Sequence, residues 1–218
     1  MFIHFLDFAD KIKPKIIVAE NVKGLISGKS KGYVNEILKK FSEIGYKPQI
    51  FLLNSATTGV PQKRERVFFI AYRKDLNFPK LNLNFNEKPI KYGEFKDKNF
   101  VPINKATQTY RLWHQRRSSD RNLANILMRT ENRNARFNSI FVHDDKVLPT
   151  VTSHGDFLRS DVPGVPSDKD FITAQTFPQD FNFCGQNVRY ICGMSVPPLM
   201  MGKIAEQIYK QWLRGDDK

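Results

Sequence analysis

Two groups of polar residues stand directly beside apolar runs, where their side chains could do chemistry. Glu20 and Asn21 follow the run "KIIVA", and Gln62, Arg64 and Arg66 precede the run "VFFIA". In open α/β sheets, ligands bind beyond the carboxyl ends of strands, where we expect Glu20 to lie. A half-buried carboxyl group there can keep a proton near neutrality and donate it to a ring nitrogen. The amide of Asn21 offers a donor and an acceptor to hold that group in place.

The second group lies in the segment 59–71, "GVPQKRERVFFIA". Alternate residues of an extended segment point the same way, so we expect Gln62, Arg64 and Arg66 on one side and Glu65 on the other. Two guanidinium groups and an amide suit a phosphate together with the polar edge of a base. Each group also has a structural explanation. The first could cap the loop that follows it, and the arginines could form a solvated edge with local ion pairs.

The first 73 residues have the pattern of an α/β sheet that would position both groups. Apolar residues with helical spacing predict two helices, one with the stripe Phe5, Phe8, Ala9 and Ile12, the other with Val34, Ile37, Leu38 and Phe41. Pro14 and Gly45 would end these helices. We expect "KIIVAE" to be a strand buried on both faces, followed by the strands "PQIFLLN" and "RVFFIAYR". The prediction is a sheet with parallel crossovers, whose three strands leave one edge uncovered.

From about residue 77 to 190, periodicity is weak, which predicts an irregular second domain with short β pieces such as "SIFVH" and "VLPTVT". Residues 105–136 hold eight Lys or Arg against two acids, interleaved with Tyr110, Trp113 and Phe137. This composition favours nucleic acid, with Arg116 and Arg117 as candidate contacts, although a solvated charged loop would look the same. After "SVPP", helical spacing predicts a last amphipathic helix with the apolar residues Met201, Ile204, Ala205, Ile208 and Trp212.

The composition supports the same class of partner. The 35 basic and 22 acidic residues give a formal net charge of +13, which favours a polyanion such as double-stranded DNA. Cys184 and Cys192 form no CxxC or CxxxC pair, so we expect no cysteine zinc site and a reduced, cytoplasmic protein. We also expect no membrane association, because no apolar stretch approaches the ~18–20 residues of a membrane span.

These segments, in this order, resemble motifs of the C5 cytosine DNA methyltransferases. "AENVKGL" is similar to that family's ENV motif, and "TTGVPQKRERVFFIA" to its GVPQxRxR motif. "TAQTFPQDF" (173–181) and "YICGMSVPPLMMGKIAEQI" (190–208) resemble its ninth motif and its last, GNSVPP-type motif. Two positions depart from the family pattern: Thr173 stands where the ninth motif usually has Arg, and Met194 where the last motif usually has Asn.

The resemblance implies the organisation of the chain. Residues 1–76 would be the C-terminal half of a Rossmann-like catalytic domain that uses S-adenosylmethionine. Residues 77–189 would form a smaller, β-rich target recognition domain, and residues 190–218 would return to the catalytic domain. Ser195 and Val196 match the part of the last motif that lies near the cofactor. The enzyme would act in a bacterial restriction-modification system.

The resemblance also implies roles for the polar groups. In that family a cytosine is flipped out of the duplex and a Cys thiolate attacks its C6, before C5 takes the methyl group of S-adenosylmethionine. Glu20 matches the residue that places a proton at N3, and Asn21 supports that geometry. Arg66 matches the arginine that contacts O2 of the base, Arg64 matches one directed at a phosphate, and Gln62 belongs to the same wall.

Two parts of the family pattern have no match in this sequence. The Gly-rich cofactor loop and the Pro-Cys-Gln nucleophile both precede ENV in the family, whereas the nineteen residues before Glu20 contain no Gly and no Cys. Cys184 and Cys192 lie in segments that match other motifs, so we expect small structural thiols. We therefore predict a partner chain that carries the loop and the nucleophile, and we expect the C-terminal helix, 199–213, to pack on that partner. An inactive truncated remnant, a non-catalytic DNA-binding module and a transfer-RNA-methylating relative remain open alternatives.

Overall fold

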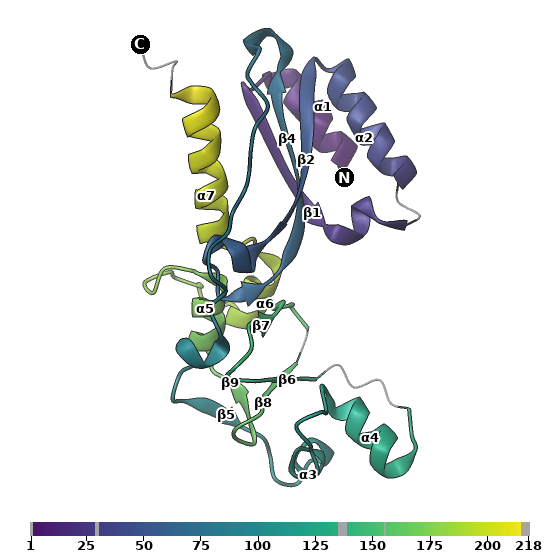
Figure 1. Ribbon diagram of the computed structural model, residues 1–218, viewed down its shortest axis with the longest axis vertical. Coiled ribbons are helices and arrows are strands. Elements are labelled where there is room, and N and C mark those ends of the chain that lie inside the picture. The colour runs from purple at the N-terminus through teal and green to yellow at the C-terminus, as the bar shows by residue number, and fades with distance from the viewer. Residues whose placement is uncertain (1, 29–30, 135–138, 155, 215–218) are drawn as a thin grey trace. The chain divides into compact units, whose positions relative to one another are not determined.

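The computed structural model describes residues 2–28, 31–134, 139–154 and 156–214, and the chain divides into two compact units (Figure 1). The first unit comprises Met1–Ser55, Glu65–Asn86 and Gly202–Lys218, and the second comprises Ala56–Arg64 and Glu87–Met201. The sequence predicted domain boundaries at 76/77 and 189/190. The main difference is that the segment Ala56–Arg64, which holds Gln62 and Arg64, belongs to the second unit and not to the first. Phe137 and the end of the basic stretch 105–136 lie outside the described residues.

In the first unit, two helices cover one face of a sheet (Figure 1). They are α1 (Phe2–Ile12) and α2 (Lys31–Glu43). Gly45, at a φ of 89°, follows the end of α2, as expected of a helix stop that needs a left-handed residue. The ring of Phe2 lies 6.3 Å from Phe41 and 5.1 Å from Phe69, so one aromatic residue joins both helices to the sheet.

The helix predicted at the N-terminus is confirmed, but it buries a different stripe. The buried residues of α1 are Phe2, Leu6 and Ala9. Phe5, Phe8 and Ile12 are 41%, 60% and 58% exposed. The helix carries apolar residues on two neighbouring stripes, and spacing alone does not tell which one meets the sheet.

The sheet has the order β1-β4-β2, with β4 antiparallel to both neighbours. The strands are β1 (Ile16–Val22), β2 (Tyr46–Asn54) and β4 (Glu65–Arg73). β1 and β2 run parallel, as expected for a crossover through α2, but β4 returns antiparallel into the space between them. The central position of β4 explains why Val67–Ala71 are fully buried, whereas only Ile17 of β1 is buried. The expectation of a strand buried on both faces is therefore wrong for β1 and fits β4.

The opposite face of this sheet holds the end of the C-terminal helix α7 (Pro198–Ile208), which continues into a π-helical turn, Tyr209–Leu213. The ring of Trp212 stacks on Phe78 at 5.7 Å and meets Tyr72 edge-on at 5.2 Å. Its indole Nε1 donates to the carbonyl of Pro79 at 2.9 Å. The final turns of this helix therefore pack on Tyr72 of β4, and the expected packing of the helix on a partner chain stays a prediction.

The second unit is built from short pieces, as its weak periodicity predicts. Its strands pair two by two: β3 (Gln62–Lys63) with β7 (Leu148–Pro149), β5 (Phe100–Pro102) with β9 (Gly164–Pro166), and β6 (Ile140–Val142) with β8 (Phe157–Arg159). Its helices are α3 (Gln108–His114), α4 (Leu123–Glu131), α5 (Asp168–Gln175) and α6 (Val188–Met194). Two small cores hold it together, one around Tyr92, Phe157 and Phe171 and one around Trp113, Leu123 and Phe141.

Short 3₁₀ turns connect these elements at Lys23–Ile26, Ser55–Thr58, Lys74–Leu76 and Tyr92–Glu94. Among the described residues, no helix has the length and apolar character needed to cross a membrane.

Candidate active site

The carboxylate of Glu20 and the guanidinium of Arg66 form an ion pair on one face of the first unit's sheet. In the β1–β4 register, Glu20 is opposite Phe68 and Arg66 is opposite Val22, which makes the charged residues diagonal neighbours on the same face. Arg66 Nε lies 2.8 Å from Glu20 Oε1, and the two side chains are 15% and 28% exposed. The pair is therefore half-buried, with a side that water or a ligand can reach.

Asn21 points to the opposite face of the sheet, because side chains alternate along a strand. Its register partner is Val67, and its Oδ1 accepts a hydrogen bond from the Val22 amide at 2.9 Å. This contact is the one expected of a residue that shapes the exit from β1. The structure thus brings Glu20 together with Arg66, while Asn21 supports the turn that follows the strand.

Gln62 lies in the interior of the second unit and is fully buried. Its Nε2 donates to Gln175 Oε1 at 2.7 Å, and its Oε1 accepts from the Val151 amide at 2.8 Å. Gln175 in turn donates to the Ser195 carbonyl at 2.8 Å. Three segments far apart in the sequence, each part of a motif that resembles the methyltransferase pattern, therefore meet in one hydrogen-bond network.

Arg64 belongs to the same buried network and is 2% exposed. Its Nη1 donates to the Val151 carbonyl at 2.8 Å, and its Nη2 donates to the Gly193 carbonyl at 3.0 Å. The alternation predicts Gln62, Arg64 and Arg66 on one side of the segment. Gln62 and Arg64 both bind the backbone of Val151 in the second unit, whereas Arg66 pairs with Glu20 in the first. Arg64 nevertheless differs from the expected phosphate contact, because it is buried and donates to two backbone carbonyls in the protein interior.

Gly193 is required where α6 approaches the segment before His154. A Cβ atom at this position would lie 2.2 Å from the amide nitrogen of Ser153 and 2.3 Å from the carbonyl carbon of Thr152. Only glycine permits this approach, which also brings the Gly193 carbonyl to Arg64. Met194, the neighbouring residue that departs from the family pattern, is 64% exposed.

Ser195 and Val196, the expected cofactor contacts, offer little to a cofactor by themselves. The Ser195 hydroxyl donates to the Cys192 carbonyl at 3.2 Å and accepts from Gln175 Nε2 at 3.0 Å. Its donor is therefore already used within the second unit, and Val196 has no polar side-chain atom. These two residues do not fit S-adenosylmethionine without further protein groups.

The two cysteines differ in accessibility. Cys192 is fully buried, and burial raises the pKa of its thiol to about 12. Because the thiolate is the nucleophilic form, Cys192 is unsuited to attack a base. Cys184 is exposed, and its amide donates to Asn182 Oδ1 at 2.8 Å.

Arg116 and Arg117 lie in the turn that follows α3 in the second unit. Arg116 is half-buried against Trp113, whereas the side chain of Arg117 is exposed. Both line a pocket of about 340 Å³ in the second unit. They form a separate cluster from the Gln62–Arg64 network, which lies in the interior.

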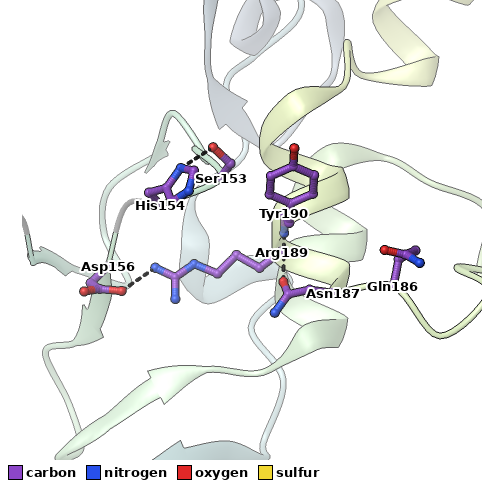
Figure 2. Close-up of a pocket in the computed structure, with 7 residues that line it drawn as sticks. All are labelled: Ser153, His154, Asp156, Gln186, Asn187, Arg189 and Tyr190. Carbon is purple, nitrogen blue, oxygen red and sulfur yellow. Dashed lines mark hydrogen bonds and ion pairs between the residues drawn. The ribbon is translucent and has the colours of Figure 1, made fainter.

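A further polar pocket of about 360 Å³ lies between α6 and the segment before β8 (Figure 2). Its lining residues are Ser153, His154, Asp156, Gln186, Asn187, Arg189 and Tyr190. Arg189 Nη2 lies 2.9 Å from Asp156 Oδ1, and the Ser153 hydroxyl lies 2.8 Å from His154 Nδ1 (Figure 2). Sequence reasoning missed this pocket because its residues come from separate segments with no common spacing.

Comparison with known proteins connects this arrangement to one family. A family model for C-5 cytosine-specific DNA methylases matches residues 1–210. The type II methyltransferase M1.HphI of Haemophilus parahaemolyticus is 30% identical over 229 residues, which cover 96% of this chain and 60% of that protein. M.NgoFVII of Neisseria gonorrhoeae is 25% identical over 237 residues, which cover 94% of this chain and 61% of that protein.

Solved structures show the same fold. A DNA modification methyltransferase encoded within an E. coli prophage has a TM-score of 0.68 at 18% identity, covering 96% of this chain and 73% of its own. Spodoptera frugiperda DNMT2 has a TM-score of 0.65 at 15% identity, covering 96% and 71%. The chain spans only 60% of the length of M1.HphI and 61% of the length of M.NgoFVII. The chain belongs to the C-5 cytosine-specific DNA methylase family, a family of S-adenosylmethionine-dependent methyltransferases.

Proposed function

We propose that this chain provides the base-binding part of a DNA (cytosine-5-)-methyltransferase of the restriction-modification type. The observation that carries the proposal is the half-buried Glu20–Arg66 pair at the end of β1. A carboxyl group and a guanidinium side by side match the N3 and O2 edge of cytosine. The carboxyl group of Glu20 can deliver a proton to N3, and the guanidinium of Arg66, which is only a donor, can hydrogen-bond to O2. In such a system the chain would work beside the bacterial chromosome, in the cytoplasm.

In the proposed reaction, a cytosine flipped out of the duplex takes the place of water beside Glu20 and Arg66. Arg66 leaves Glu20 and donates to O2 of the base, which holds its orientation, while Glu20 takes up a proton from solvent as the ion pair opens and places that proton at N3. This proton makes C6 more electrophilic toward a thiolate supplied from outside these 218 residues. Groups already positioned for charge that develops in the transition state need no reorganisation during the reaction.

Gln62 and Arg64 have a positioning role in this proposal. Their side chains bind Val151, Gly193 and Gln175 inside the second unit, so they hold the segment that leads into β4. A charged side chain held by hydrogen bonds in the interior is costly to move. We therefore assign phosphate binding to other cations.

We further propose that a partner chain supplies the Gly-rich cofactor loop and the Pro-Cys-Gln nucleophile, and that S-adenosylmethionine is held jointly. Ser195 and Val196 do not fit the cofactor alone, and the thiol of Cys192 is buried with a raised pKa. The first unit also leaves the apolar residues Phe5, Phe8 and Ile12 exposed on one stripe of α1. An apolar stripe of this kind is a typical site for further protein to cover.

Complementation tests this function. The chain is co-expressed with a polypeptide that carries the two missing motifs, and transfer of a labelled methyl group to duplex DNA is measured. We expect transfer by the complex and none by either chain alone, and changing the nucleophilic Cys of the partner to Ser should abolish transfer. Methyl transfer by this chain alone, or by a complex with the Ser variant, would contradict the proposal.

The second candidate is a non-catalytic DNA-binding module. The formal net charge of +13 favours it, because charge supports DNA binding with or without chemistry. Under this alternative, a well-folded complex would bind duplex DNA and transfer no methyl group to any cytosine-containing sequence.

A further inference from the structure

We propose that Arg189 is a positioning residue for the choice of methylation site, because its ion pair with Asp156 fixes the segment that carries Ser153 and His154. The inference rests on the proposed function, since it concerns which DNA sequence the complemented enzyme methylates. Arg189 lies on α6, and its side chain extends to Asp156 on the facing segment, where Nη2 lies 2.9 Å from Oδ1 (Figure 2). Both residues line the polar pocket of about 360 Å³.

The facing segment, which comprises residues 151–154 and Asp156, is held from the interior at its start and in its middle. Arg64 Nη1 donates to the Val151 carbonyl at 2.8 Å. Further along, α6 approaches so closely that a Cβ atom on Gly193 would lie 2.2 Å from the Ser153 amide nitrogen. The backbone of the segment is therefore fixed as far as Ser153.

Arg189 holds the end of the same segment. The Asp156 carbonyl accepts from the Ile140 amide at 2.7 Å, and β8 begins at the next residue, so the segment joins the β6–β8 pair at Asp156. The ion pair adds a side-chain contact from α6 at this point. Ser153 and His154 therefore lie between two contacts made by one helix, and these contacts set the direction of both side chains.

The environment of Arg189 is costly if the residue serves stability alone. Its side chain is 21% exposed, and its guanidinium lies 5.4 Å from the ring centroid of Phe171. Its Nε is buried and has no hydrogen-bond partner among the described residues. A buried donor without a partner destabilises a fold, and an apolar side chain against Phe171 would avoid that cost. The guanidinium is better explained by the arrangement that it specifies, which is the place of Asp156.

The side chains that Arg189 positions can distinguish one ligand edge from another. The Ser153 hydroxyl lies 2.8 Å from His154 Nδ1, so Nε2 is the ring nitrogen that a ligand in the pocket can meet. The His154 ring meets the ring of Tyr190 edge-on at 6.3 Å, and Tyr190 is 45% exposed. An imidazole nitrogen and a phenol can each donate or accept, which suits the polar edge of a base. Which edge they accept depends on the direction that the ion pair sets.

The complemented complex tests this role with duplexes of randomised sequence, whose methylated sites are read by bisulfite sequencing. We expect Arg189→Met to lower the preference for the wild-type site, over sites that differ at one base pair, by about tenfold. Its midpoint of urea denaturation should stay at the wild-type value or rise, because the unpartnered Nε is removed. Asp156→Asn should lower the preference equally, and the double variant should be no worse than either single variant.

Two further variants serve as controls. Arg189→Lys retains the charge and should retain most of the preference. Lys39→Met removes an exposed ion pair with Glu43 of α2, at 3.8 Å, and should leave the preference unchanged. If Arg189 is only structural, Arg189→Met would lower the denaturation midpoint and the rate without changing the choice of site, which would overturn the proposal. A loss of preference that Asp156→Asn does not reproduce would also overturn it, because Arg189 would then act without Asp156.

A wild-type complex that transfers no methyl group would contradict the proposed function and not the positioning role. In that case, the sequences that the chain binds are selected from the same randomised duplexes. Arg189→Met and Asp156→Asn should both broaden the selected set. A wild type that selects no sequence, or variants that select the same sequences as the wild type, would overturn the role of Arg189.

Discussion

Arg64 and Arg66 stand two positions apart in one motif, yet they have opposite surroundings in the structure. Arg64 is 2% exposed in the second unit and binds two backbone carbonyls. Arg66 lies in the first unit, where its side chain is 15% exposed and pairs with the carboxylate of Glu20. Backbone carbonyls in the interior cannot be exchanged for a ligand, whereas an ion pair that is partly exposed can open to one. Two arginines in one short segment can therefore have different roles: Arg64 holds the backbone of the second unit in place, whereas Arg66 can contact a ligand.

The largest expected effect is on the architectural side of this comparison. Arg64→Met should destabilise the second unit by about 2–4 kcal/mol, because it leaves the buried carbonyls of Val151 and Gly193 without a donor. Urea denaturation measures the effect. Arg66→Met is the matched control and should change stability by less than about 1 kcal/mol, since its pair is partly exposed. Equal losses in the two variants would erase the distinction between the arginines.

The next effect is on the chemical side. In the complemented complex, Arg66→Ala should lower kcat/KM about 10- to 100-fold, the equivalent of about 1.5–3 kcal/mol for a hydrogen bond to a charged group. DNA affinity should fall as well, because the flipped base loses a contact. The measurement is steady-state methyl transfer together with filter binding. Loss of affinity with an unchanged rate at saturating DNA would show that Arg66 binds DNA without acting on the base.

Acid should act on the second unit through Asp161. The guanidinium of Arg159, 2.7 Å away, and the ammonium of Lys96, 2.8 Å away, hold the pKa of that carboxyl well below its usual range. A lowered folded pKa contributes stability that is fully present above the unfolded value of about 3.9 and is lost as pH falls below it. Burial raises the pKa of Asp170, which acts in the opposite direction.

The free energy of unfolding, measured by denaturation at pH 5 and at pH 3 for the wild type and for Asp161→Asn, separates the contribution of Asp161 from that of Asp170. The wild type should lose stability between these two pH values, and the variant should lose less. A variant with the same loss as the wild type would remove Asp161 from the explanation.

The smallest effect should come from the ion pair beside the candidate site. Lys23 Nζ lies 3.0 Å from Glu65 Oε2, and the two side chains are 51% and 40% exposed. Lys23→Ala should cost no more than about 0.5 kcal/mol and leave the methylation rate unchanged, because exposed pairs are weak. A rate change of tenfold or more would extend the chemical region beyond Glu20 and Arg66.

Much of the first unit could be predicted from the sequence, because its signals are local. The spacing of Ile37 and Phe41 and the stop at Gly45 correctly predict α2 and its end. The insertion of β4 between β1 and β2 could not be predicted, because strand order depends on contacts between distant segments. The buried face of α1 was also missed, since Phe2 and Leu6 compete with Phe5 and Phe8 for the sheet.

The second unit was harder because its elements are short. Hydrophobic periodicity did not predict α3 and α4. Each helix nevertheless begins with a residue type that favours an N-cap: the Thr107 hydroxyl accepts from the Tyr110 amide, and Asn122 Oδ1 accepts from the Asn125 amide. For the site, alternation predicted a shared side for Gln62 and Arg64, which both bind the backbone of Val151. Alternation could not show that this side faces the protein interior. A period of two tells which side chains share a side of a strand, but not whether that side meets solvent or other protein.

The most direct test of the central claim is the single-turnover rate of methyl transfer by the complemented complex carrying Glu20→Gln. If Glu20 places a proton on the base, the rate should fall about 10²- to 10⁴-fold, the range typical of general acid catalysis, while DNA affinity stays nearly unchanged. Gln is close in shape to Glu and retains a donor, so the fold should survive. A complex that methylates DNA at the full rate with Gln at position 20 would contradict the account and reduce Glu20 to a structural partner of Arg66.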